Sequence, residues 1–266
     1  MINCEKRKVA HGMTTLNVKP NETFALSEDE RLAFRDNGYL GPFTLCSPEE
    51  MAEIRVELDR ILGEGAKVIS EQSPAHNRHL DCRLVHDLAS HPAIVQRMAS
   101  IVGPDLFLWR THFWVKEPGG AEIPWHQDYN YWPLEPAVIL SAWIAIDEAR
   151  LDNSAVQIIP GSHRTILPHV PSPQGMAFGE MADPSRVDTS KAVDMVLKPG
   201  EFFLFNERTL HHSFKNTSTD RRLGLASRVI PGIVNVLRYD GDRHRLVKIS
   251  GEDRLGFNQL CDPPSA

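Results

Sequence analysis

Two short segments that lie far apart in the chain carry residue types suited to metal chemistry. The first is Trp125-His126-Gln127-Asp128, and the second runs from His211-His212-Ser213 to Arg221-Arg222. A histidine and a carboxylate two positions apart, together with a distant histidine, can hold one face of an Fe(II) ion and leave the other face open. Open positions on such an ion predict oxygen chemistry.

The chain contains two His-x-Asp triplets, and a triplet of this kind also arises by chance. His79-Leu80-Asp81 lies in a polar stretch without a strand pattern, and we expect a solvated surface segment there. His126 and Asp128 lie in an extended segment, where residues two apart share a face, so both side chains can converge on one ion. Judged from these two residues alone, a hydrogen-bonded His-Asp pair at a strand end is the alternative.

The secondary structure that must position these residues changes from helices to strands along the chain. The N-terminal part of the sequence predicts three helices. The first begins after a capping box of Ser27 and Glu30 and ends at Gly38, the second begins at Ser47 with Pro48 in its first turn and ends near Gly63, and the third spans 92–102. In the second helix the residues predicted to share one face are Met51, Ile54, Leu58 and Ile61.

Short extended runs follow the helices. They cover 106–115, 138–146, 155–159, 201–205, 211–214 and 223–230, separated by Gly, Pro, Asn and Asp. Helices followed by many strands predict an α+β, mainly β fold, a double-stranded β-helix or cupin-like jelly roll with the N-terminal helices packed on one sheet. Residues 165–192 read as one long loop, which is typical of a lid or flap.

The predicted organisation is an N-terminal arm over 1–25 and a single domain over 26–266, with a metal-binding core at 105–231. Charged residues follow the initial Met in place of an apolar run, and no apolar stretch is long enough to cross a bilayer, so we expect a cytoplasmic protein without a membrane partner. A net charge of -6 makes nucleic-acid binding unexpected. The scattered cysteines predict neither disulfides nor structural zinc; they are Cys4, Cys46, Cys82 and Cys261. Oligomeric state is open.

The sequence resembles the phytanoyl-CoA dioxygenase family of Fe(II)/2-oxoglutarate oxygenases from Phe34 to Pro231. The matching motifs are 125–128, Ser141 through Asp147, 152–154, Ile159-Pro160-Gly161-Ser162-His163, and the run from Leu210 to Arg222. In the family pattern the third iron ligand is a histidine eleven residues before an arginine that binds 2-oxoglutarate, with a serine two residues after the histidine and an asparagine five after. His211 meets these conditions with Ser213, Asn216 and Arg222, whereas His212 does not.

Strand parity agrees with this choice, because neighbouring residues face opposite sides and Ser213 shares the face of His211. The resemblance therefore implies a metal site of His126, Asp128 and His211. It implies cosubstrate contacts from Arg222, Ser213 and Trp143, with His112 as a further candidate. Trp143 could equally be a core residue. His163 belongs to a turn that is a structural signature, and the remaining histidines read as surface or helix-flanking residues.

The cofactors that the resemblance implies are Fe(II), 2-oxoglutarate and O2. A planar guanidinium at Arg222 suits the distal carboxylate of 2-oxoglutarate, and Ser213 can add a hydroxyl donor. Decarboxylation of 2-oxoglutarate then yields succinate and CO2 while an unactivated C–H of the substrate is hydroxylated. Related halogenases have a small residue in place of the carboxylate, so the presence of Asp128 favours hydroxylation over chlorination.

The substrate is expected to be a small polar, anionic metabolite such as an amino acid or a phosphonate. Alternate residues of a strand point to the same face. If His211 and Arg222 face the barrel interior, Arg110, His112 and Arg228 are therefore expected to face it too. An ordinary amphipathic edge strand is the alternative for the segment around Arg110. The residues after the carboxylate are candidates for the cavity wall: Tyr129, Asn130, Tyr131 and Trp132.

Two other functions remain open at this stage. The same site could support desaturation, epimerisation or ring closure in secondary metabolism. Alternatively, the chain could be a non-catalytic jelly-roll binding protein with a vestigial metal site. An intact set of three ligands with Arg222 counts against the binding protein, because a module that only binds needs no cosubstrate anchor.

Overall fold

The computed structural model describes residues 22–64, 74–237 and 245–265. Helices come first and two main β-sheets follow, as the change of pattern along the sequence predicted. Residues 1–21, most of the expected N-terminal arm, lie outside the described residues.

The larger sheet has seven strands and forms one wall of the fold. In spatial order they are β1 (Tyr39–Thr44), β10 (Glu201–Asn206), β5 (Leu140–Ala145), β12 (Arg222–Pro231), β2 (Leu106–Lys116), β14 (Leu246–Ser250) and β15 (Leu260–Cys261). All neighbouring pairs are antiparallel except β14 and β15. The longest ladder joins β12 to β2.

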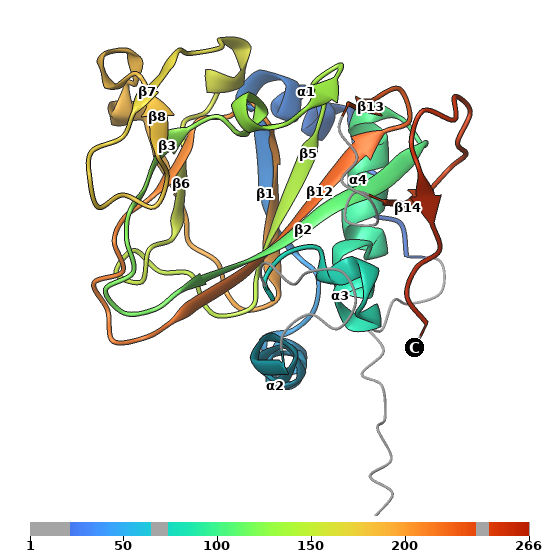
Figure 1. The fold of residues 1–266 in the computed structure, drawn as a ribbon, viewed down its shortest axis with the longest axis horizontal. Coiled ribbons are helices and arrows are strands. Elements are labelled where there is room, and N and C mark those ends of the chain that lie inside the picture. Colours follow the sequence, from blue (N-terminus) through green and yellow to red (C-terminus); the bar gives the residue numbers. More distant parts are fainter. Residues whose placement is uncertain (1–21, 65–73, 238–244, 266) are drawn as a thin grey trace, which may run out of the picture.

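The smaller sheet carries the first motif and the second histidine on neighbouring strands. Its order is β3 (Ile123–His126), β11 (His211–Ser213), β6 (Val156–Ile158) and β9 (Val193–Met195). Two further strand pairs are β4 (Leu134–Glu135) with β13 (Asn235–Val236), and β7 (His169–Pro171) with β8 (Glu180–Ala182). Apolar side chains from both sheets, among them Val156, Phe203 and Phe205, form one core between them, which confirms the jelly roll (Figure 1).

The helices begin and end where their capping residues predicted. In α1 (Glu28–Asn37) Ser27 and Glu30 form the capping box, and Gly38 ends the helix with φ of 76°. In α2 (Pro48–Glu64) the amide of Glu50 donates to the Ser47 side chain at 3.2 Å. The third predicted helix is α4 (Pro92–Val102).

Helices cover the outer face of the large sheet, as expected. The four α2 residues predicted to share a face are all buried, in one core with α3 (Arg83–Ala89), α4 and strands of the large sheet. Figure 1 shows α3 and α4 against this sheet, with the C-terminal strand β14 near its edge. No helix in the described ranges is long and apolar enough to cross a membrane.

The expectation of a surface segment at His79-Leu80-Asp81 is wrong. His79 is fully buried, its Nδ1 lies 3.0 Å from the Thr111 hydroxyl, and Arg78 pairs with Asp81 at 2.9 Å between two buried side chains. The polar residues are buried because they pair with one another and with β2, which local sequence does not reveal. This segment forms a 3-10 turn, Arg78–Leu80.

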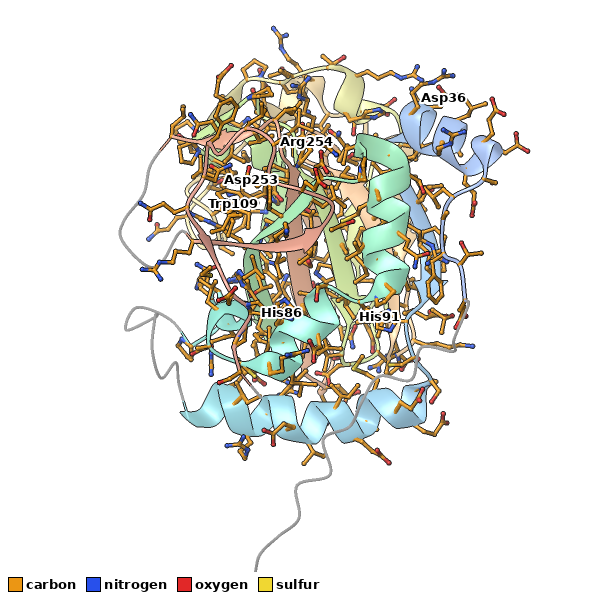
Figure 2. The ribbon with its side chains drawn as sticks, turned by 90° about the vertical axis from the view of Figure 1, so that its right-hand side faces the viewer. Asp36, His86, His91, Trp109, Asp253 and Arg254 are labelled. Carbon is orange, nitrogen blue, oxygen red and sulfur yellow. The ribbon has the colours of Figure 1, made fainter. Side chains whose placement is uncertain are left out.

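Helix α3 was not predicted, and it changes the reading of two histidines. His86 lies within α3 and His91 at the start of α4 (Figure 2); both are buried, so they are not surface residues, although His91 does flank α4 as its N-cap. His91 Nδ1 accepts from the amide of Ala93 at 3.1 Å.

β14 pairs with β2 only at 106–108, and farther along this side of β2 His112 has an isolated bridge to His76, so the edge-strand alternative for the segment around Arg110 stays open. The segment 165–192 is not one continuous loop, because it contains β7, β8 and two 3-10 turns, Pro184–Arg186 and Thr189–Lys191. The C-terminal segment supplies β14 and β15, which had no predicted structure.

Candidate metal and cosubstrate site

The first motif lies where a strand passes into a turn. β3 ends at His126, Gln127 keeps an extended backbone with φ of -117° and ψ of 127°, and Asp128 opens a 3-10 turn, Asp128–Tyr131. The extended step puts His126 and Asp128 on one side. Gln127 points away and donates to the backbone carbonyls of Thr165 and Arg208 at 2.8 and 2.6 Å.

The second motif lies on the neighbouring strand of the same sheet. His211 is directly opposite His126 in the β11–β3 register. His212 faces away, with its Nε2 2.9 Å from the Glu122 carboxylate and its ring stacked on Trp125 at 4.9 Å between centroids. The structure therefore brings His211, and not His212, to His126.

His126, Asp128 and His211 form the one group of histidine, cysteine and carboxylate side chains in the described ranges that could hold a metal ion. Their candidate ligand atoms all lie within 4.8 Å of one another. Asp128 Oδ1 is 3.6 Å from His126 Nε2 and 3.9 Å from His211 Nε2. The hydrogen-bonded His-Asp pair that the sequence left open is not formed at this distance.

Hydrogen bonds set the tautomers that a metal requires. Nδ1 of His126 donates to the Pro124 carbonyl at 2.8 Å, and Nδ1 of His211 donates to the Thr209 carbonyl at 3.0 Å. Each Nε2 lone pair is then directed at the triad, as in metal-ligating histidines. Burial, and to a smaller extent the neighbouring His126, lowers the pKa of His211 to about 3, so its ring is neutral at physiological pH.

The carboxylate completes a donor set that fits Fe(II). Burial raises the pKa of Asp128, but the charge of Arg228 and the two neighbouring histidines outweigh it and lower the pKa below the ordinary value. Oδ2 of Asp128 is buried without a hydrogen-bond partner. Two neutral imidazoles and one carboxylate on one face are the arrangement found in non-haem Fe(II) oxygenases.

A buried cation lies next to this triad. Arg222 is 1% exposed, donates from its Nη1 to the Ser154 carbonyl, and has its guanidinium 5.2 Å from the centre of the Trp143 ring. Its Nε has no hydrogen-bond partner. Burial lowers the pKa of Arg222 to about 10, which leaves it charged at neutral pH. His211, Ser213, Trp143 and Arg222 line one cavity together with His126.

Lys116 is a second cation beside Arg222, and sequence reasoning assigned it no role. Its Nζ donates to the hydroxyls of Ser213 and Ser154 at 2.8 and 2.9 Å and to the Phe214 carbonyl at 2.8 Å. Burial, and to a smaller extent the positive charge of Arg222, lowers the pKa of Lys116 to about 7. The alternation of polar and apolar residues along β2 was the signal that could have found Lys116.

A second cavity opens on the other side of Asp128, with a volume of about 210 Å³. Four of the candidate substrate residues line it: Arg110, Tyr131, Trp132 and Arg228. His112 lines this cavity and not the one with Arg222, and its ring centre lies 3.9 Å from that of His76 in a tilted contact and 4.1 Å from that of Trp114 in an edge-on contact. Tyr129 lines neither cavity, and the side chain of Asn130 lies outside the described part of the chain.

Two aromatic residues of this cavity could not have been assigned from local sequence. Phe178, between β7 and β8, packs edge-on against His126 at 4.8 Å. His76 meets His112 through an isolated bridge between their backbones. Both residues belong to segments that read as loops, and only tertiary contacts bring them to the site.

Comparisons with known proteins agree with this geometry. The family model of phytanoyl-CoA dioxygenase matches residues 34–224. A probable alpha-ketoglutarate-dependent hypophosphite dioxygenase from Stutzerimonas stutzeri is 28% identical over 221 residues, which cover 73% of this chain and 75% of that protein. An ectoine dioxygenase from Nocardia farcinica is 25% identical over 211 residues, covering 69% and 70%.

Among solved structures, CytC3 with Fe(II) and alpha-ketoglutarate superimposes with a TM-score of 0.73 at 28% identity, covering 90% of this chain and 94% of that one. The fold and the site thus define an Fe(II)- and 2-oxoglutarate-dependent oxygenase that uses O2. The chain belongs to the phytanoyl-CoA dioxygenase family.

Proposed function

We propose that this enzyme hydroxylates an unactivated C–H bond of a small polar, anionic metabolite. One oxygen atom of O2 would enter the substrate and the other succinate, with CO2 released from 2-oxoglutarate. The observation that carries the proposal is the complete triad, because Asp128 lies within 4 Å of both histidine Nε2 atoms and supplies the carboxylate.

His126, Asp128 and His211 would hold the iron, which when bound supplies the oxidising chemistry. Arg222, Lys116 and the Ser213 hydroxyl would bind the distal carboxylate of 2-oxoglutarate, with Trp143 as the apolar wall. Charge-assisted bonds in a buried site orient the cosubstrate and exclude water. Phe178 and Tyr131 would shield the open side of the triad, which supports a lid role for the segment between β7 and β8.

The cavity beside Asp128 supports a small substrate. Its volume of about 210 Å³ lies below the roughly 300–1,000 Å³ of sites for drug-sized ligands. Arg110 and Arg228 line it and favour an anion. The two relatives named for hypophosphite and ectoine are also named for small polar compounds. We assign Arg110, His112, Tyr131, Trp132 and Arg228 to this substrate site.

Anaerobic addition of Fe(II) and 2-oxoglutarate tests the chemistry. The visible charge-transfer band of the chelate is expected to form, and admission of O2 with a substrate should release succinate. Folded protein that gives no band would overturn the proposal. Product analysis separates hydroxylation from desaturation, epimerisation or ring closure at the same site, and a band without succinate for any anionic metabolite would favour the vestigial binding protein. A cytoplasmic location and a single domain over 26–266 stay predictions.

A further inference from the structure

The two oxygens of the Asp128 carboxylate face different partners. Oδ1 is the oxygen directed at the other candidate ligands, 3.6 Å from Nε2 of His126 and 3.9 Å from Nε2 of His211. Oδ2 lies 3.5 Å from Nη2 of Arg228. One carboxylate therefore offers one oxygen to the metal position and the other to a cation.

The ion pair between Asp128 and Arg228 joins the two main sheets beside the triad. Asp128 lies just beyond the end of β3 in the small sheet, whereas Arg228 belongs to β12 in the large sheet. Both side chains are buried, and solvent screens a buried pair much less than an exposed one. Burial raises the pKa of Asp128, and among the groups that lower this pKa Arg228 has the largest effect. The attraction therefore acts directly on the carboxylate ligand.

The position of Arg228 is fixed by its strand and by an indole ring. At this residue β12 is paired with β2 on one side and with β5 on the other. The guanidinium lies 4.8 Å from the centre of the Trp132 ring, and Trp132 packs edge-on against Trp109 at 5.5 Å. A planar guanidinium stacked on a ring keeps a defined orientation. Strand pairing and Trp132 thus hold the cation next to Oδ2 of Asp128.

The number of carboxylate oxygens that bind the metal decides how many positions stay open. Two imidazoles and one carboxylate oxygen leave three positions of a six-coordinate ion free, enough for two oxygens of 2-oxoglutarate and for O2. A carboxylate can also bind a cation through both of its oxygens. If Asp128 did so, one of the three free positions would be lost.

We propose that Arg228 is a positioning residue for Asp128: it retains Oδ2, so that Oδ1 alone binds the iron and a coordination position stays open for 2-oxoglutarate. This inference rests on the proposed function, because it takes the triad as the iron site. It gives Arg228 a role besides lining the substrate cavity. Arg228 would act on the metal through Asp128.

Mn(II) is a probe that reports the open positions without O2 or turnover. The relaxation of water protons by bound Mn(II) measures how many water molecules the ion carries. In the unmodified protein, with His126, His211 and one oxygen of Asp128 as ligands, about three water molecules are expected on a six-coordinate ion. In Arg228→Gln the Oδ2 atom is free to bind as well, so one water fewer is expected.

Two affinities of Arg228→Gln should change in different directions. Mn(II) should bind at least as tightly as in the unmodified protein, because a second carboxylate oxygen joins and a nearby positive charge is removed. The dissociation constant of 2-oxoglutarate, measured from the chelate band with Fe(II) and without O2, should rise about tenfold or more, because an occupied position must first be cleared. A merely structural role would weaken both.

Arg97→Gln is the matched control. Arg97 lies on α4, and its guanidinium is also held by an aromatic ring, 4.2 Å from the centre of Phe43. It lines neither cavity of the site. This variant loses the same charge and a similar stacking contact, and it should keep the water count and the affinity for 2-oxoglutarate.

About two water molecules in the unmodified protein would overturn the inference without any variant, because Asp128 would then bind through both oxygens beside an intact Arg228. An unchanged water count in Arg228→Gln would overturn it as well and leave Arg228 with the substrate role alone. If the chelate band does not form in the unmodified protein, the proposed function fails. An intact band with either of these water counts removes only the positioning role of Arg228.

Discussion

Lys116 and Arg222 lie directly opposite each other between β2 and β12, and both donate hydrogen bonds to Ser154, one to its hydroxyl and the other to its carbonyl. Two buried cations side by side repel each other, and burial penalises both charges. The pKa of Lys116 is accordingly lowered to about 7. An anion bound between them would remove the repulsion, so we expect the pair to couple binding of 2-oxoglutarate to the protonation of Lys116.

The affinity for 2-oxoglutarate is therefore expected to fall as pH rises above 7. In the free enzyme Lys116 is protonated below its pKa of about 7 and neutral above it. The bound dianion favours the charged form, so binding takes up a proton at higher pH, and the dissociation constant should rise up to about tenfold per pH unit. Titrations of 2-oxoglutarate into the Fe(II) enzyme from about pH 6 to about pH 9 measure this slope.

Lys116→Met is the control for that slope. The variant should bind 2-oxoglutarate more weakly at low pH and lose the pH dependence that Lys116 causes. A flat profile in the unmodified enzyme, or the same slope in Lys116→Met, would contradict the coupling.

His211→Ala is expected to abolish both the chelate band and succinate release, because it removes one of three candidate ligands. His212→Ala should retain both, since His212 contacts Glu122 and Trp125 on the far side of the strand. Anaerobic absorption spectra of the two variants give the comparison. Loss of the band in His212→Ala with retention in His211→Ala would reverse the assignment.

Arg222→Gln should raise the KM for 2-oxoglutarate by about 30-fold or more, the effect of losing about 2 kcal/mol of buried charge pairing. The neighbouring Arg221 instead pairs with Asp147 and Asp59 at 2.9 and 2.6 Å. Arg221→Gln is expected to lower the free energy of unfolding by about 1 kcal/mol with an unchanged KM. Steady-state kinetics and thermal unfolding of both variants separate the two roles.

Gly224→Ala is expected to displace Trp143, because a Cβ at Gly224 would lie 2.1 Å from the Cζ2 atom of that ring. Overpacking of this kind costs about 1–3 kcal/mol of unfolding free energy, and the KM for 2-oxoglutarate should rise as well. Gly63 in α2 has open space at its Cβ position, so Gly63→Ala should be neutral or stabilising by up to about 1 kcal/mol. An unperturbed KM and stability in Gly224→Ala would show that Trp143 is free to move.

Arg78→Ala is expected to lower the free energy of unfolding by about 3–5 kcal/mol, because it removes the buried cation that pairs with the Asp81 carboxylate. Arg83 makes a comparable ion pair with Asp87, but both side chains are more than a third exposed. Arg83→Ala should therefore cost at most about 1 kcal/mol. Chemical denaturation of both variants provides the test, and equal losses would argue for the surface segment first expected at His79-Leu80-Asp81.

Elements whose signals are local could be predicted from the sequence alone. Capping residues placed α1 and α2, the apolar period predicted which side of α2 is buried, and alternation along β11 predicted that His211 and His212 face opposite sides. The motif spacing also selected the same histidine that the structure brings to Asp128. These features depend on a few neighbouring residues, so the chain order alone carries them.

Features that depend on which strands are neighbours are set by the folding of the whole chain. The register of β12 with β2 places Lys116 opposite Arg222 and Arg110 opposite Arg228. Pairing with β14 gives β2 a second neighbouring strand at 106–108, and packing against β2 buries His79, which local polarity had suggested was exposed. Polar residues can be buried when distant partners satisfy them, and those partners are supplied only by the folded chain.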